Sequence, residues 1–191
     1  IPCYNCATSI TKVVTKIMTG SFIPNEVLVY DDASSDGTLE ILNQLSARYP
    51  QLHVYSSYAN HGAGAARNFL LKKCTSDYIA FCDSDDYWNY NKLELQISEM
   101  IKRKCDLSIT NYIITDCKGN VISSRKLPRN VTFFRMHFAN FIPTSGAVFA
   151  RKLAMSQEMP DLRKRQDYAF WLLLFKANKN LKCVTIEDYL F

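Results

Sequence analysis

The stretch Tyr78-Ile79-Ala80-Phe81-Cys82, followed directly by Asp83-Ser84-Asp85-Asp86, decides the fold. The first five residues are apolar and too few for a helix, so they predict a buried strand, and the acidic residues predict a loop. The same pattern occurs earlier, where Glu26-Val27-Leu28-Val29-Tyr30 precedes Asp31-Asp32. Buried strands that end in polar loops are typical of open α/β sheets, which bind ligands at the carboxyl ends of their strands.

Helices with regularly spaced apolar residues are predicted between these strands. They cover residues 10–18, 39–45, 63–74 and 93–101, and a further short strand is predicted at 52–55. Regular alternation of strand and helix indicates a mainly parallel sheet with helices on both faces. The fold class we expect is therefore α/β, with a Rossmann-like sheet flanked by helices.

The second part of the chain has a more mixed pattern. Two strands, at 107–115 and 121–123, flank the turn residues Cys117-Lys118-Gly119-Asn120 as in a hairpin. Helices are predicted at 131–140 and 166–177, and a strand at 146–150. We expect one domain over residues 1–191, with a first part at about 1–105 and a smaller mixed part at about 106–191. Because the chain begins at Ile1-Pro2 without an initiator Met, we also expect its N-terminal strand to be truncated.

Composition limits the class of protein. With 191 residues, 48% of them hydrophobic, the chain can bury one substantial core. No apolar run approaches the roughly 20 residues that a membrane-spanning helix needs. The net charge of +5 is spread along the chain and gives no reason to expect a nucleic-acid partner. The seven cysteines are odd in number, and Cys3-x-x-Cys6 has no second pair at zinc-site distance, so we expect reduced thiols and a cytoplasmic setting.

The acidic cluster after the strand at 78–82 has two interpretations. Three carboxylates within four residues repel one another unless a cation or hydrogen-bond donors balance them, and carboxylates suit Mg²⁺ or Mn²⁺. The same residues also suit a turn that caps the helix beginning near Tyr90. Spacing alone leaves both interpretations open.

The order of several short motifs narrows the choice. The motifs are Pro2-x-Tyr4-Asn5, Asp31-Asp32-x-Ser34-x-Asp36-Gly37-Thr38, Gly62-x-x-x-Ala66-Arg67-Asn68, Asp83-Ser84-Asp85-Asp86, and Gln166-Asp167 before Trp171. Together, over nearly the whole chain, they resemble the motif series of the family 2 glycosyltransferases of the GT-A fold. The family often has Glu where this chain has Gln166, a departure that removes one charge and that we do not interpret as a loss of activity. The two parts of the chain would then be the nucleotide-binding and acceptor-side parts of one GT-A catalytic domain.

The resemblance implies a set of site residues. Donor-binding residues would be Pro2, Tyr4, Asn5, Asp32, Arg67, Asp83 and Ser84, and the ligands of a divalent metal (Mn²⁺ or Mg²⁺) would be Asp85 and Asp83. Structural alternatives remain for two of them, because Asp32 could close its loop and Arg67 could pair with a nearby Asp. By the same resemblance Asp167 would be the catalytic base of an inverting displacement, while its alternative is a first-turn acid favoured by the helix dipole. The acceptor pocket would involve Thr144-Ser145-Gly146.

The function implied is transfer of a sugar from a nucleotide-sugar donor, with UDP-sugar as the expected class, to a hydroxyl of a glycan or lipid-linked acceptor in bacterial surface polysaccharide synthesis. Peripheral contact with the inner membrane face is expected. The alternative from another class is a non-catalytic nucleotide-sugar-binding protein of the same fold. A dinucleotide-dependent oxidoreductase is disfavoured, because Gly62-x-Gly64 lacks the third glycine of that fingerprint.

Two interpretations are also open for five aromatic residues, Phe133, Phe134, Phe138, Phe141 and Trp171. They could form a sugar-stacking or lipid-facing surface, but their helical spacing favours packing in the core. The three histidines have no predicted role.

Overall fold

The computed structural model describes residues 1–155 and 157–191. The first part of the chain forms β1 (Pro2–Cys3), α1 (Ile10–Met18), β2 (Val27–Asp32), α2 (Thr38–Arg48), β3 (Leu52–Ser57), α3 (Ala63–Lys73), β4 (Tyr78–Ala80) and α4 (Lys92–Arg103). The second part forms β5 (Leu107–Thr115), β6 (Val121–Arg125), α5 (Phe133–Met136), the 3-10 turn η1 (Thr144–Gly146), β7 (Val148–Ala150), α6 (Arg151–Ala154), α7 (Gln166–Ala177) and β8 (Cys183–Tyr189).

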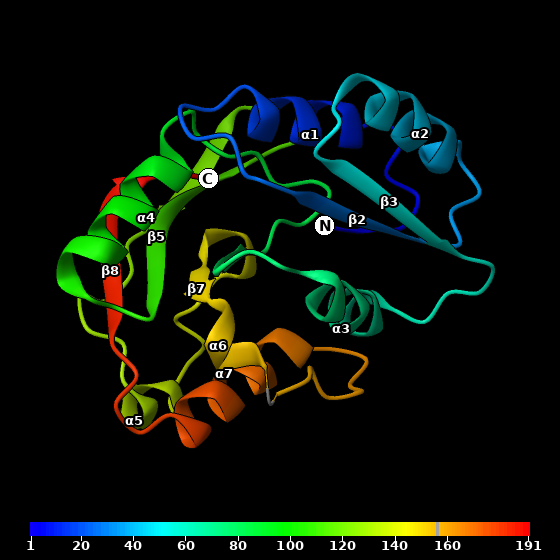
Figure 1. The fold of residues 1–191 in the computed structure, drawn as a ribbon. Helices are drawn as coiled ribbons and strands as arrows, with labels where there is room; N and C mark the ends of the chain where they lie inside the picture. The colour runs from blue at the N-terminus through cyan, green and yellow to red at the C-terminus, as the bar shows by residue number, and fades with distance from the viewer. Residues whose placement is uncertain (156) are drawn as a thin grey trace.

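The first sheet is parallel and has the order β1-β2-β3. Val27 pairs with Leu52 and Tyr30 with both Pro2 and Tyr55, so the three strands end together at the same edge. Helices α1 and α2 cover one side of this sheet, and α3 lies on the other (Figure 1). The predicted alternation of strand and helix is confirmed here.

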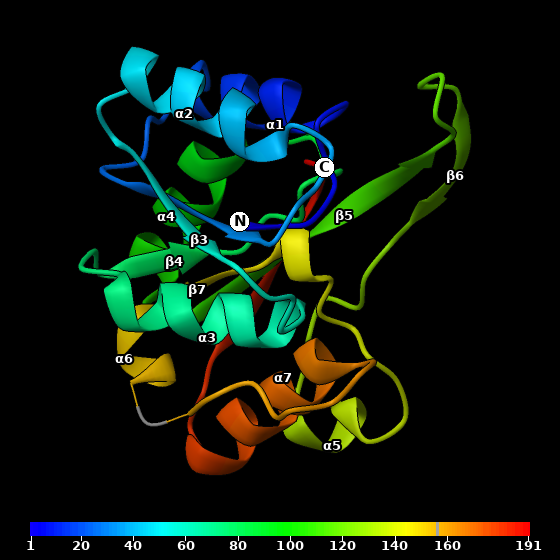
Figure 2. The ribbon, with the colours of Figure 1, turned by 90° about the vertical axis from the view of Figure 1, so that its right-hand side faces the viewer.

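The second sheet is mixed and has the order β4-β7-β5-β6, with β8 added beside β5. Strand β7 is antiparallel to both β4 and β5, whereas β8 is parallel to β5. The β5–β6 hairpin projects from the body of the molecule (Figure 2), with its turn at the predicted residues. Strand β8 was not predicted, because Cys183–Tyr189 mixes polar and apolar residues without a strict alternation.

Two hydrophobic clusters hold the sheets and helices together. The first joins α1 and α2 to β2, through residues such as Val14, Val29 and Leu42, none of which is exposed. The second is aromatic, and it contains Phe149 and Trp171, whose ring centroids lie 5.5 Å apart. The predicted burial of Trp171 is confirmed.

The predicted helix at 131–140 and the predicted burial of its aromatic residues are wrong in part. The helix is limited to Phe133–Met136, and Met136 is its buried residue. Phe134 and Phe138 are 71% and 74% exposed, and Phe133 is 37% exposed. A single turn has only one inward position, so helical spacing does not carry the other rings into the core.

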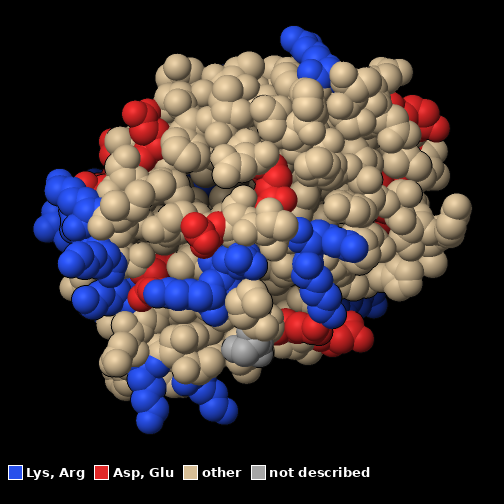
Figure 3. Space-filling model, viewed as in Figure 1, with Lys and Arg blue, Asp and Glu red and all other residues tan. Residues whose placement is uncertain are grey.

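Three surface and chemical features bear on the expectations from composition: the distribution of charge, the state of the cysteines and the lengths of the helices. On the face shown in Figure 3, Lys and Arg side chains lie over α4 and around the lower part of the molecule as well as at its upper edge, so positive charge is not confined to one patch. All seven cysteines are free. In the described part of the chain, no helix combines the length and apolar character needed to cross a bilayer.

Candidate donor and acceptor site

The loop after β2 is tied to the loop after β1. The Asp36 carboxylate accepts hydrogen bonds from the N–H groups of Ala7 (3.0 Å) and Thr38 (3.1 Å), and the hydrogen bond from the Thr38 hydroxyl lowers the Asp36 pKa most. The Asn5 side chain accepts from Ser35 N–H at 2.8 Å. Asn5 itself has a φ of 49°, a left-handed conformation that Asn tolerates better than most residues. These bonds fix the shape of the loops that contain the first two motifs.

The predicted donor residues in these loops differ in exposure. Pro2 is buried within β1, whereas Tyr4 and Asn5 are exposed just beyond it. Asp32 is buried, and its carboxylate accepts from the N–H groups of His61 (2.9 Å) and Gly62 (2.7 Å). Asp32 therefore closes its loop in this structure, and its role in donor binding stays a prediction.

The neighbouring residue Asp31 has one buried carboxylate oxygen without a hydrogen-bond partner among the described residues. Its Oδ2 accepts from Ser34 N–H at 3.2 Å, but its buried Oδ1 has no hydrogen-bond partner among the described residues. A buried carboxylate oxygen that lacks a donor is costly unless a ligand supplies one. The edge of the first sheet thus retains an unused acceptor beside the predicted donor residues.

Arg67 joins α3 to the acidic loop after β4. Its guanidinium is almost fully buried and its Nη2 forms an ion pair with Asp83 Oδ1, while its buried Nε has no partner among the described residues. The structural alternative considered for Arg67, pairing with a nearby Asp, is therefore present. A buried cation fixed at this point also adds positive potential beside the acidic loop.

The other two acids of this loop, Asp85 and Asp86, have no arginine partner, of the kind that Asp83 has, among the residues that the structure describes. Asp85 is exposed, and Ser84 accepts a hydrogen bond from the Ser9 hydroxyl at 2.7 Å through its carbonyl oxygen. Burial raises the pKa of Asp86 to about 6, and the nearby carboxylates Asp83 and Asp85 add to that rise against a hydrogen bond from Ser145. Within residues 1–155 and 157–191, no three His, Cys, Asp or Glu side chains already converge as a metal site.

The turn η1 supports the acidic loop from behind. The Asp83 N–H donates to the Ser145 hydroxyl at 2.9 Å, and Trp88 Nε1 donates to the Ser145 carbonyl at 3.0 Å. Gln96 Nε2 in turn donates to the Gly146 carbonyl at 2.9 Å. Sequence reasoning missed Trp88 and Gln96, because nothing near them in the chain indicates contacts with residues about 50 positions away.

The predicted base lies on the other side of the same turn. Asp167 is half-buried in the first turn of α7, and its Oδ2 accepts from the Thr144 hydroxyl at 3.0 Å and from Asn140 Nδ2 at 3.4 Å. Thr144 and Ser145, adjacent in sequence, therefore connect the predicted base to the acidic loop. Asn140 was not predicted as a site residue, since its contact with Asp167 spans 27 positions.

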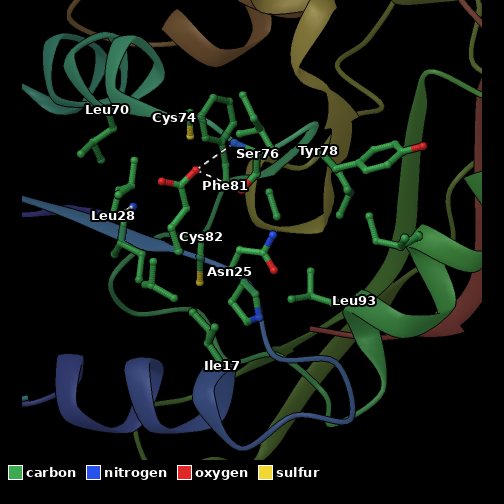
Figure 4. Close-up of a pocket in the computed structure, with 18 of the residues that line it drawn as sticks. Ile17, Asn25, Leu28, Leu70, Cys74, Ser76, Tyr78, Phe81, Cys82 and Leu93 are labelled. Carbon is green, nitrogen blue, oxygen red and sulfur yellow. Dashed lines mark hydrogen bonds between the residues drawn. The ribbon is translucent and has the colours of Figure 1, made fainter. Parts of the chain in front are cut away.

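The structure also contains a mainly apolar cavity. A cavity of about 260 Å³ lies between β2 and β4, and apolar side chains including Ile17, Leu28, Leu70 and Leu93 line it (Figure 4). The Ile1 nitrogen donates to the Leu28 carbonyl at 2.8 Å beside this cavity. Apolar walls do not suit a nucleoside diphosphate, so the acidic edge remains the candidate donor site. The expected truncation of the first strand stays a prediction.

Two curated proteins resemble the chain over most of its length. The "Putative teichuronic acid biosynthesis glycosyltransferase TuaG" of Bacillus subtilis (strain 168) is 34% identical over 176 residues, which are 92% of this chain and 70% of TuaG. The Escherichia coli protein "UDP-Glc:alpha-D-GlcNAc-diphosphoundecaprenol beta-1,3-glucosyltransferase WfgD" is 33% identical over 179 residues, which are 93% of this chain and 69% of WfgD.

Solved structures share the fold. TarS 1–349 of S. aureus, which has also been solved with UDP and with UDP-GlcNAc, matches with a TM-score of 0.80 at 24% identity, over 99% of this chain and 57% of that one. The mannosyltransferase PcManGT of Pyrobaculum calidifontis, solved with GDP-Man and Mn²⁺, matches with a TM-score of 0.75 at 20% identity, over 98% of this chain and 53% of that one. The chain thus spans little more than half of each solved chain, and the likeness establishes the GT-A fold.

The family assignment rests on sequence. Residues 1–160 match the family described as Glycosyl transferase family 2. This matched segment contains four of the five motifs on which the resemblance was based. The fifth, Gln166-Asp167, lies just beyond the matched residues. The chain belongs to Glycosyl transferase family 2.

Proposed function

We propose that this chain transfers a hexose from a UDP-sugar, with inversion, to a hydroxyl of a lipid-linked glycan during synthesis of a bacterial surface polysaccharide. The relatives support the substrate classes, because WfgD is named for a UDP-glucose donor and a diphosphoundecaprenol-linked acceptor, and TuaG for teichuronic acid synthesis. The TarS structures with UDP and UDP-GlcNAc support the same donor nucleotide.

One observation carries the proposal. Thr144 bonds to the Asp167 carboxylate and Ser145 bonds to the Asp83 backbone, so consecutive residues hold the predicted base and the predicted donor loop. An inverting transfer needs the base within hydrogen-bond reach of the attacking hydroxyl and the donor's anomeric carbon next to it. A turn that fixes both groups supplies that arrangement.

The chemical step belongs to Asp167. Its carboxylate would accept the proton of the acceptor hydroxyl as that oxygen forms its bond to the anomeric carbon and the bond to the nucleoside diphosphate breaks. The hydrogen bonds from Thr144 and Asn140 to Oδ2 would orient the carboxylate and leave Oδ1 for the proton. A single displacement inverts the anomeric centre.

The acidic loop fits a divalent cation. Asp83 and Asp85, the predicted ligands, supply hard oxygen atoms, and both carboxylates add to the rise in the Asp86 pKa that burial mainly causes. When bound, the ion would neutralise the charge that grows on the departing diphosphate. The presence of Mn²⁺ with GDP-Man in PcManGT supports a metal in this fold.

The test begins with binding rather than turnover. UDP, GDP, UDP-glucose and UDP-GlcNAc are titrated calorimetrically with and without Mn²⁺, using the parent, Asp85→Ala and the control Asp77→Ala. Asp77 is an exposed acid just before β4, at the opposite end of that strand from the acidic loop. We expect Mn²⁺-dependent binding of the uridine nucleotides, weakened about tenfold or more in Asp85→Ala, because a metal ligand is lost. Equal binding in all three proteins would contradict the proposed donor site.

A sugar-transfer assay distinguishes an enzyme from a non-catalytic nucleotide-sugar-binding protein. The nucleotide-sugar that binds best is offered with a diphosphate-linked glycan, and the anomeric configuration of the product is read by NMR. An inverted product supports the proposal. Metal-dependent binding without any transfer would support the non-catalytic binding protein instead.

A further inference from the structure

An aromatic surface outside the donor site has no partner in the described structure. We define the α5 surface as Phe133, Phe134, Arg135 and Phe138. All four residues are exposed, and the rings of Phe134 and Phe138 meet edge to face with centroids 5.2 Å apart. Side chains of this kind ordinarily bury 150–250 Å² each, so their exposure side by side marks an interaction site rather than core packing.

This surface is fixed to the helix that begins with the predicted base. Helix α5 lies beside α7 in both ribbon views (Figures 1 and 2). The Tyr168 hydroxyl donates to the Met136 carbonyl, and Asn140 Nδ2 donates to the Asp167 carboxylate. A partner that docks on α5 is therefore held next to the acceptor side of the candidate site.

Basic residues predominate in this part of the chain, although exposed Asp161 precedes the basic run at 163–165 and Glu187 pairs with Arg129. Between Asp116 and Glu158 the sequence contains seven Lys and Arg residues and no Asp or Glu. Arg135 is exposed on α5 itself, and the exposed run Arg163-Lys164-Arg165 directly precedes α7. Basic residues close to an anionic leaflet are attracted to it over about one Debye length. Exposed aromatic rings beside basic residues therefore complement an anionic bilayer.

We propose that the α5 surface docks the chain on an anionic membrane and so holds Asp167 at the depth where a lipid-linked acceptor presents its sugar. The proposal rests on the proposed function for its lipid-linked acceptor. Phe134 and Phe138 would enter the interfacial region while Arg135 and the run at 163–165 remain at the phosphate level. Attachment through a few rings and cations is reversible, which lets the protein leave after each transfer.

Vesicle binding tests the docking without any chemistry. The parent, Phe134→Ser/Phe138→Ser and the control Tyr58→Ser are sedimented with phosphatidylglycerol vesicles and with phosphatidylcholine vesicles at several salt concentrations. Tyr58 is a fully exposed aromatic residue in the loop after β3, so the control removes a ring from another surface. We expect parent and control to bind phosphatidylglycerol less well as salt rises, because salt screens the basic residues, and we expect about tenfold or more weaker binding in the double variant, because two rings are lost. Failure of the parent to bind, or equal binding of all three, would overturn the proposal.

Transfer assays then distinguish a membrane surface from a sugar platform. The same proteins are given one acceptor in two forms, a water-soluble short-chain diphosphate and a long-chain form embedded in vesicles. We expect the double variant to match the parent on the soluble form and to lose about tenfold on the embedded one. An equal loss on both forms would overturn docking in favour of sugar stacking. If the parent transfers to neither acceptor, the proposed function fails, while the sedimentation result still decides whether the surface binds membranes.

Discussion

The proposed donor edge and the proposed acceptor face of this molecule are held by different kinds of contact. At the donor edge, Asp32, Asp36 and Asp83 each have backbone or arginine partners within the fold. At the acceptor face, Asp167 is half-buried and depends on two side-chain donors, Thr144 and Asn140. The donor loops are thus shaped before any ligand binds, whereas the acceptor side remains open. A fold that binds one class of donor but different acceptors in different proteins would need a rigid donor side and a more variable acceptor side.

Replacing the proposed base, Asp167, should have the strongest effect on turnover. Asp167→Asn keeps the shape of the side chain but cannot take a proton, so we expect kcat to fall about 10²–10⁴-fold with nucleotide binding unchanged. Steady-state kinetics and calorimetry measure the two quantities on the same protein. A parallel fall in UDP affinity would show that the two sides are not separate.

The balance of charge in the acidic loop predicts a pH-dependent stability. Burial raises the pKa of Asp86 from 3.8 to about 6, so the folded state is penalised once that carboxylate ionises. Asp86→Asn should match the parent near pH 4 and be more stable by about 2 kcal/mol at pH 8. Urea unfolding across this range measures the difference in the free energy of unfolding.

Asp116→Asn provides a control of opposite sign for that measurement. Hydrogen bonds from Asn120 hold the pKa of Asp116 below its ordinary value, so this variant should lose stability relative to the parent above about pH 4. If Asp86→Asn followed the same direction, the interpretation of the acidic loop as unbalanced would be wrong.

Orientation of the base should have a smaller effect. Thr144→Val removes the hydroxyl that donates to Asp167 but keeps the branched shape, so we expect kcat to fall about tenfold, as for one lost hydrogen bond to a charged group. Thr144→Ser retains the hydroxyl and should restore most of the rate. A comparable fall in both variants would point to packing rather than orientation.

The smallest effect is expected at His61, whose ring is mostly exposed. Its backbone N–H, not its side chain, donates to Asp32 at 2.9 Å, so His61→Ala should change nucleotide affinity less than about twofold. His61→Pro removes that N–H and should weaken binding more. A large loss in His61→Ala would show that the imidazole, whose Nδ1 lies 3.8 Å from Asp32 Oδ1, contributes to nucleotide binding.

Several features could be predicted from the sequence because their signals are local. The strands before Asp31 and Asp83 are short apolar runs, and the hairpin turn at Cys117–Asn120 lies between two apolar segments. The ordered motifs also identified the family over nearly the whole chain. Strand β8 could not be predicted in the same way, because its residues pair with β5 more than 70 positions earlier and show no clear pattern of their own.

The α/β class, the acidic loops and the family follow from residue types at short spacing in the chain. The contact of Ser145 with the Asp83 loop, the contact of Thr144 with Asp167, and the exposure of Phe134 and Phe138 are visible only in the folded molecule. These facts depend on contacts between distant segments, or on the lack of them. Periodicity shows which residues can share a face, but the packing of other elements decides whether that face is covered.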